Sequence, residues 1–190
     1  MSAEAIRLVT LAIEARLKEA LKTAGGNNQT TFVGPLDDQS ARNAALVLFL
    51  YRVTANQSLR NSEHWVSPAR AGDPDRAYAN SLPLDLHYLL TVGPREQAGE
   101  PESLRLLGYA LQALNDFPIL AGSKVEGETV RLSLDPVSSE EISRVWALFP
   151  TVNYRTSVLY LASPIWIDPA TPQPQAPGVT NQDVLAGQAA

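Results

Sequence analysis

The sequence predicts an α+β domain in which helices pack against a mixed, mainly antiparallel β-sheet. Three observations lead to this prediction. Three segments repeat apolar residues every three or four positions, which is typical of amphipathic helices. Two other segments are apolar on nearly every residue, as in strands that are covered on both faces. The order of these segments along the chain, with strands and helices in irregular alternation, is that of an α+β domain.

Length and composition limit the possible function classes. The chain has 190 residues, 45% of them hydrophobic, which suits one domain with a real core. Its net charge of −5 argues against nucleic acid as the main partner, because phosphate binding needs a basic surface. The chain has no cysteine and only two histidines, which argues against disulfides, thiolate sites and multi-histidine metal centres. We therefore expect neither a cofactor nor a metal.

The first predicted elements are a long helix and a short strand. Apolar residues follow helical spacing over residues 3–24, with Ser2 as a possible N-cap and Gly25 as a stop signal. The residues that share the apolar face are Ile6, Val9, Ile13, Leu17 and Leu21. A turn-rich connection follows, and it includes a short strand at about residues 31–33.

The middle of the chain predicts two central strands separated by a long loop. Residues 44–54 place apolar side chains on both faces: Leu46, Leu48 and Leu50 on one, Val47, Phe49 and Tyr51 on the other. Residues 82–92 form a second buried strand. The polar residues 61–81 between them are expected to be a loop, and loops of this length are usually functional or mobile.

The last part of the domain predicts two more helices and two more strands. A helix is expected over residues 103–115, with Gly108 in its middle at a cost of about 1 kcal/mol relative to alanine. Residues 129–135 alternate as a half-buried strand after a hairpin at residues 126–127. Ser138 and Glu141 form a capping box that starts the next helix. The final strand is expected over residues 154–162.

We expect the chain to divide into a domain, residues 1–168, and a proline-rich C-terminal tail, residues 169–190. The tail is rich in Pro, Gln, Ala and Gly, so it should not belong to the core. We expect it to lie along a neighbouring subunit, anchored by Val184 and Leu185, its only adjacent pair of large aliphatic residues.

Several polar residues lie inside the apolar strands. Asp85 and His87 are two positions apart and share one strand face, and Arg52 follows Leu48 and Leu50 on theirs. A carboxylate in an apolar strand is costly unless it is paired, so we expect Asp85 to form an ion pair with Arg52 or Arg155.

A catalytic interpretation of the same residues has weaker support. Asp85, His87 and Ser157 are the residue types of a hydrolase triad, but no G-x-S-x-G turn surrounds Ser157. Asp85 and His87 would supply only two metal ligands, and no further ligands are apparent in the sequence.

The exit of the first central strand is the best candidate for an interface. Arg52, Asn56, Arg60 and Asn61 gather where the strand enters the long loop. Arginine is favoured at interfaces because its planar guanidinium forms several hydrogen bonds at once. The alternative is that these residues brace the 61–81 loop within the chain.

No targeting or membrane segment is expected. The N-terminus lacks the apolar region of a secretory signal, and the longest apolar run, residues 44–51, is too short to span a bilayer. These features predict a cytoplasmic protein without a membrane partner.

Five segments together resemble a known family. The most specific is the motif from Tyr51-Arg52 to Arg60-Asn61, followed by Leu-Asp-Leu-His-Tyr at residues 84–88. The full set is 6–13, 48–61, 82–91, 106–114 and 154–160. Their order and spacing resemble the cap, or tail-terminator, proteins of extracellular contractile injection systems, headless phage-tail-like particles of the antifeeding-prophage and virulence-cassette type. The resemblance covers residues 2 to about 168.

The resemblance implies a structural role without catalysis. Members of this family form a hexameric ring at the end of the particle distal to the baseplate. The ring closes the inner tube and anchors the last layer of the sheath, and the fold is similar to that of phage tail terminators. The resemblance therefore implies three partners: other copies of the chain, the inner tube protein and the sheath protein.

Two alternatives come from other function classes. One is a small hydrolase-like enzyme that uses Asp85, His87 and Ser157. The other is a monomeric protein-binding module that acts through the 61–81 loop.

Overall fold

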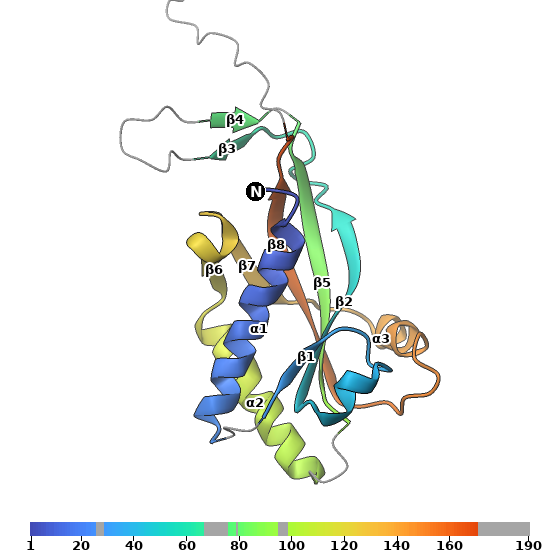
Figure 1. The fold of residues 1–190 in the computed structure, drawn as a ribbon. Coiled ribbons are helices and arrows are strands. Elements are labelled where there is room, and N and C mark those ends of the chain that lie inside the picture. The colour runs from blue at the N-terminus through green and yellow to red at the C-terminus, as the bar shows by residue number, and fades with distance from the viewer. Residues whose placement is uncertain (26–28, 67–75, 79, 95–98, 171–190) are drawn as a thin grey trace, which may run out of the picture.

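A six-stranded mixed sheet forms the centre of the molecule (Figure 1). The computed structural model describes residues 1–25, 29–66, 76–78, 80–94 and 99–170. The strand order is β1-β2-β5-β8-β7-β6; β1 and β2 are parallel and all other neighbours antiparallel. The strands are β1 (Thr31–Val33), β2 (Leu46–Ala55), β5 (Leu82–Val92), β6 (Ile119–Ala121), β7 (Thr129–Leu134) and β8 (Ser157–Ile167). The predicted mixed, mainly antiparallel sheet is thus confirmed.

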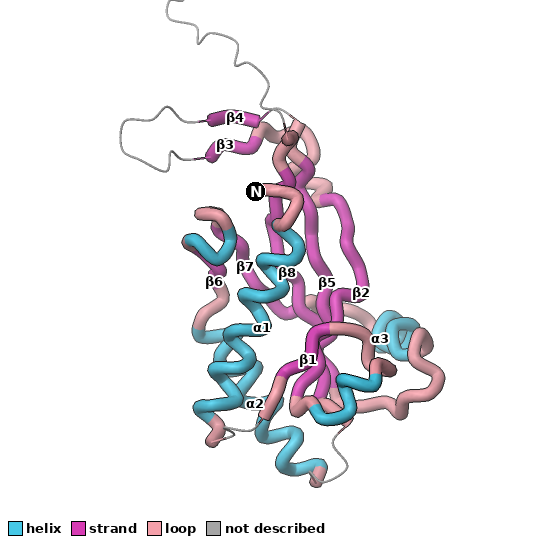
Figure 2. Tube along the Cα trace, in the orientation of Figure 1, coloured by secondary structure: helices cyan, strands magenta, loops and turns pink. Residues whose placement is uncertain are grey.

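Helices cover the two faces of the sheet unequally. Helices α1 (Ala5–Thr23) and α2 (Glu100–Asp116) lie together on one face, and the short helix α3 (Ser139–Trp146) lies on the other (Figure 2). The larger core joins α1 and α2 to the side chains of Leu84, Leu86, Tyr88 and Leu90 on β5. The smaller core, beneath α3, contains Val47, Leu89, Val145, Trp146 and Leu159. Each central strand is therefore apolar on both faces, which accounts for its continuous apolar sequence.

Helix α1 occupies nearly the predicted residues but begins later. Its N-cap is Glu4, while the Ser2 hydroxyl donates to Glu126 Oε1 at 2.6 Å. Gly25 follows the end of the helix with a φ of 80°, in the left-handed region that favours glycine, as the stop signal predicted. Thr10 on α1 also lies 2.7 Å from the Tyr88 hydroxyl, which ties the helix to the middle of β5.

A β-bulge at Tyr51 changes which way the end of β2 faces. Leu50 pairs with Tyr88, but the next paired residue, Arg52, is opposite His87, so Tyr51 is an extra residue. A one-residue shift turns every following side chain to the other face. The expectation that Arg52 shares a face with Leu48 and Leu50 is therefore wrong: Arg52 faces the α3 side.

Three strand predictions are corrected by the structure. The 61–81 loop contains a two-stranded sheet of β3 (His64–Val66) and β4 (Arg76–Tyr78). The three-residue β6 was missed because it is too short to show periodicity. The last strand begins at Ser157 and continues past Pro164 to Ile167, because Pro164 lies where the pairing with β5 is irregular and needs no N–H.

Candidate interaction site

The α3 side of the sheet carries a polar network where β2, β5, β7 and β8 lie side by side. Asp85 and His87 both face this side, since they alternate with the core residues Leu84, Leu86 and Tyr88. The shared face predicted for Asp85 and His87 is confirmed.

The structure corrects the expected ion pair of Asp85. The Asp85 carboxylate accepts hydrogen bonds from Asn56 Nδ2 at 2.9 Å and from Ser163 Oγ at 2.5 Å. Within the described residues, Arg52 and Arg155 have other partners. Hydrogen bonds from neutral donors, rather than an ion pair, therefore compensate for the desolvation of this half-buried carboxylate.

Asn56 is used within the chain. Besides its bond to Asp85, its Oδ1 accepts the backbone N–H groups of Ser58 and Leu59, each at 3.1 Å. Its own N–H donates to the Pro83 carbonyl at 2.9 Å. Asn56 therefore fixes the turn at the end of β2, and its place in an interface stays a prediction.

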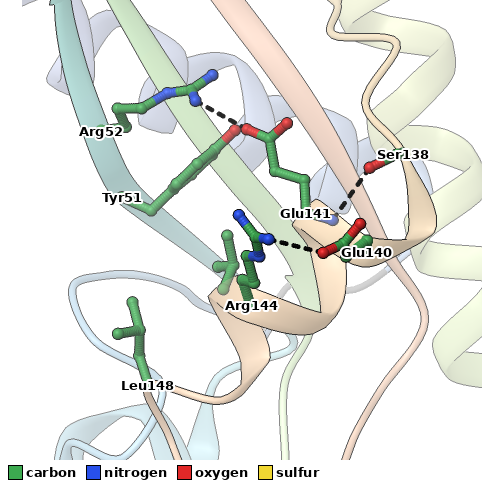
Figure 3. Close-up of a pocket in the computed structure, with 8 residues that line it drawn as sticks. Tyr51, Arg52, Ser138, Glu140, Glu141, Arg144 and Leu148 are labelled. Atoms are coloured by element: carbon green, nitrogen blue, oxygen red, sulfur yellow. Dashed lines mark hydrogen bonds and ion pairs between the residues drawn. The ribbon is translucent and has the colours of Figure 1, made fainter.

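Arg52 joins β2 to α3. Its Nη1 lies 2.8 Å from Glu141 Oε1, and its guanidinium carbon lies 5.6 Å from the centre of the Tyr51 ring. Figure 3 shows Arg52 reaching toward Glu141, while the Glu141 backbone N–H donates to Ser138 Oγ at 3.2 Å. The capping box is thus confirmed on the Ser138 side only, because the Glu141 side chain reaches to β2 instead of back to Ser138.

The space between β2 and α3 is a cleft of about 400 Å³ with balanced charge. Arg52 pairs with Glu141, and Arg144 pairs with Glu140 at 2.6 Å. Burial raises the pKa of Tyr51 to about 12, and the carboxylates of Asp135 and Glu141 add to the rise against the opposite effect of Arg52. Tyr51 is therefore a neutral phenol at physiological pH, and the cleft holds no excess cation for an anionic ligand.

His87 binds groups other than those of a triad. Its Nδ1 lies 2.7 Å from Asp135 Oδ2, which requires an N–H there, and its Nε2 lies 3.0 Å from Thr54 Oγ1. The Ser157 hydroxyl oxygen lies 3.0 Å from Thr91 Oγ1 and 2.7 Å from the Arg155 carbonyl oxygen, within hydrogen-bonding distance of both. Thr91 is four residues from His87, about 13 Å along an extended strand. The structure therefore does not bring Ser157 to His87.

The remaining predicted residues lie in three places. Arg60 and Asn61 are exposed in the turn after β2. Arg155 donates from Nη1 to the Gly93 carbonyl at 2.9 Å, and burial lowers the pKa of its guanidinium. Val184 and Leu185 lie outside the described residues. Asp135 and Glu141, which hold His87 and Arg52, were missed as partners because their pairing depends on contacts between distant elements.

Two negative findings apply to the described part of the chain. No group of three or more His, Asp or Glu side chains there could hold a metal ion. None of its helices combines the length and the apolar character that a membrane crossing requires.

Comparison with known proteins supplies a family. The model of the Pvc16 N-terminal domain matches residues 8–181 of the chain. A comparison with curated proteins finds no match.

Two solved structures share the fold. One is a sheath/tube terminator of an extracellular contractile injection system, PVC, in its extended state, with a TM-score of 0.63 and 19% identity. The other is the tube-terminating cap of the anti-feeding prophage, with a TM-score of 0.61 and 17% identity. The matches cover 100% and 93% of this chain but only 66% and 59% of those two chains.

Proposed function

Because the chain belongs to the Pvc16 N-terminal domain family, we propose that it is a structural cap protein that ends the tube of a contractile injection system. The observation that carries the proposal is the family match over residues 8–181, and the shared fold with a tube terminator and a tube-terminating cap supports it. In this role the chain acts through surfaces and not through catalysis.

The finer proposal is a hexameric ring that closes the inner tube and anchors the last sheath layer. Its partners are other copies of the chain, the inner tube protein and the sheath protein. Arg60 and Asn61 support it, because they are exposed in the turn after β2, the start of which Asn56 fixes by accepting bonds from Ser58 and Leu59. We propose that the ring assembles in the cytoplasm and becomes part of the particle.

The arrangement of the polar network favours this role over the hydrolase alternative. Asp85 is bonded to Asn56 and Ser163, and His87 to Thr54 and Asp135. These bonds join neighbouring strands and help to hold their register, which is a structural use of these polar side chains. A nucleophile next to a base would be needed for hydrolysis.

The direct test is binding to tube ends. Purified protein is mixed with inner tubes of the same system, and the ends are imaged by electron microscopy. We expect a density of six subunits at one end of each tube. The Arg60→Ala variant should occupy fewer ends. The control Arg7→Ala, which removes an exposed arginine of α1 that pairs with the N-cap residue Glu4, should bind normally. Bare tube ends at saturating protein would refute the proposal.

A further inference from the structure

Among the described side chains of the β3–β4 hairpin, His64 is the buried one that contacts the end of the sheet. A two-stranded ribbon by itself is marginally stable in water, so its attachment decides where it lies. His64 is 4% exposed, whereas the next residue, Trp65, is 62% exposed. Side chains alternate along a strand, so His64 faces the domain and Trp65 faces away from it. The hairpin lies across the end of β5 and β8, beside the N-terminus (Figure 1).

The contacts of the His64 ring fit its charged form. The ring stacks on Trp166, with centroids 4.6 Å apart and planes at 9°. Nδ1 lies 2.6 Å from Asp168 Oδ1, and Nε2 lies 3.2 Å from the Glu128 carboxylate. An ionised carboxylate only accepts hydrogen bonds, so both ring nitrogens must carry a hydrogen. A neutral ring would turn a lone pair toward one of the two carboxylates.

The polar and charged groups around His64 come from several parts of the chain. Asp168 also accepts a bond from Ser81 Oγ at 2.6 Å and one from the N-terminal ammonium, which lies 3.9 Å from Glu128. On β4, the residue opposite His64 is Tyr78. Glu126 is engaged by Ser2. The two carboxylates that touch the ring are therefore Asp168 and Glu128, and a charged His64 offsets them.

The pKa values of these groups shift in the directions that the geometry implies. Burial lowers the pKa of His64, but its hydrogen bonds to Glu128 and Asp168 outweigh burial, and the pKa is raised above its ordinary value. Burial likewise raises the pKa of Asp168, but bonds from the N-terminal ammonium, Ser81 and His64 outweigh it and lower that pKa. The pair is thus held as imidazolium and carboxylate.

We propose that His64 is a pH-responsive joint, which fixes the β3–β4 hairpin to the end of the sheet when the ring is charged and releases it when the ring is neutral. The contribution is complete below pH about 6.5, where His64 would be charged even in an unfolded chain. It is lost as the pH rises through the raised pKa of the folded state. The inference goes beyond the cap function and does not depend on it.

The test uses the full chain, in which His64 and His87 are the two histidines. Imidazole NMR signals are followed against pH, together with amide exchange protection factors for residues 64–66 and 76–78. Protection factors correct for the intrinsic pH dependence of exchange. Hairpin protection should fall by up to about tenfold for each pH unit between about 6.5 and the His64 midpoint of the folded chain, and it should level off above that midpoint. Protection of the β6–β7 pair, which lacks a histidine, should stay constant.

Three variants separate the joint from general stability. Glu128→Gln should lower the His64 midpoint and shift the loss of hairpin protection by the same amount. His64→Gln should abolish the pH dependence of hairpin protection. His87→Gln should leave it intact, because His87 bonds to Thr54 and Asp135, whereas His64 bonds to Asp168 and Glu128. The proposal is overturned if wild-type hairpin protection is constant across the His64 midpoint, or if Glu128→Gln does not move that midpoint. Neither result requires His64→Gln to fold.

Discussion

Asn56 Nδ2 lies 2.9 Å from Asp85 Oδ1, so an amide in the turn directly after β2 meets a half-buried carboxylate on β5. The same amide donates to Ser163 Oγ at 3.2 Å, which extends the bond to β8. We expect Asn56→Ala to lower the free energy of unfolding by about 1–3 kcal/mol, because it leaves a partly buried acceptor without one donor. Urea unfolding measures this loss.

The control for Asn56 is Asn61→Ala, five residues along the same turn. The Asn61 side chain is exposed, so its removal should change stability by less than about 0.5 kcal/mol. Equal losses in the two variants would show that the Asn56–Asp85 bond is not a stabilising contact.

Two glycines should respond in opposite ways to alanine. A Cβ at Gly93 would lie 1.9 Å from the Ala44 carbonyl oxygen, whereas nothing lies within 4 Å of a Cβ at Gly108. We expect Gly93→Ala to destabilise the chain by about 1–3 kcal/mol or more through a backbone shift. Gly108→Ala should stabilise it by about 1 kcal/mol, because alanine favours the helix. Thermal unfolding of both variants would distinguish these effects, and a stabilised Gly93→Ala would contradict the close approach of β5 to residue 44.

The Arg52–Glu141 pair should contribute little to stability. The two side chains are 42% and 33% exposed, so solvent screens their attraction. A double-mutant cycle with Arg52→Ala and Glu141→Ala should give a coupling energy below about 1 kcal/mol, weakened further by salt. A coupling of several kcal/mol would show that this pair is a main link between β2 and α3.

Removal of the proline-rich tail should affect assembly and not folding. Because residues 170–190 are poor in bulky apolar residues, their deletion should leave the melting temperature of the isolated chain unchanged. We expect the truncated chain to occupy fewer tube ends than the full-length protein when the two are compared in parallel binding assays. Loss of the folded state on truncation, or full end binding by the truncated chain, would refute the proposal that the tail lies along a neighbouring subunit.

The long apolar segments were predictable because the sequence pattern and the environment agree. Residues 82–92 are apolar at nearly every position, and β5 spans those residues because, like its neighbours β2 and β8, it lies between two cores. The capping residue Ser138 was predictable for a similar reason, since its contact with Glu141 spans only three residues. In both cases the pattern that predicts the feature lies within a short stretch of sequence.

The arrangement of the polar residues depends on contacts that the sequence pattern does not contain. One extra residue, Tyr51, reverses the face of Arg52. Glu141 meets Arg52, and Asp135 meets His87, only in the folded sheet. The expected ion pair between Asp85 and an arginine is wrong because strand register, and not charge alone, decides which side chains meet. The irregular pairing near Pro164 instead brings Ser163 to Asp85.

The central claim, that the chain caps the particle, is tested most directly by electron microscopy of particles from a producing strain that lacks this protein. The length distribution of sheathed tubes is measured and compared with that of the parent strain and of the deletion strain supplied with the wild-type chain. The account predicts tubes of irregular length, with bare ends and unstable sheath, and restoration by the supplied chain. Particles of normal length with intact sheath in the deletion strain would contradict it.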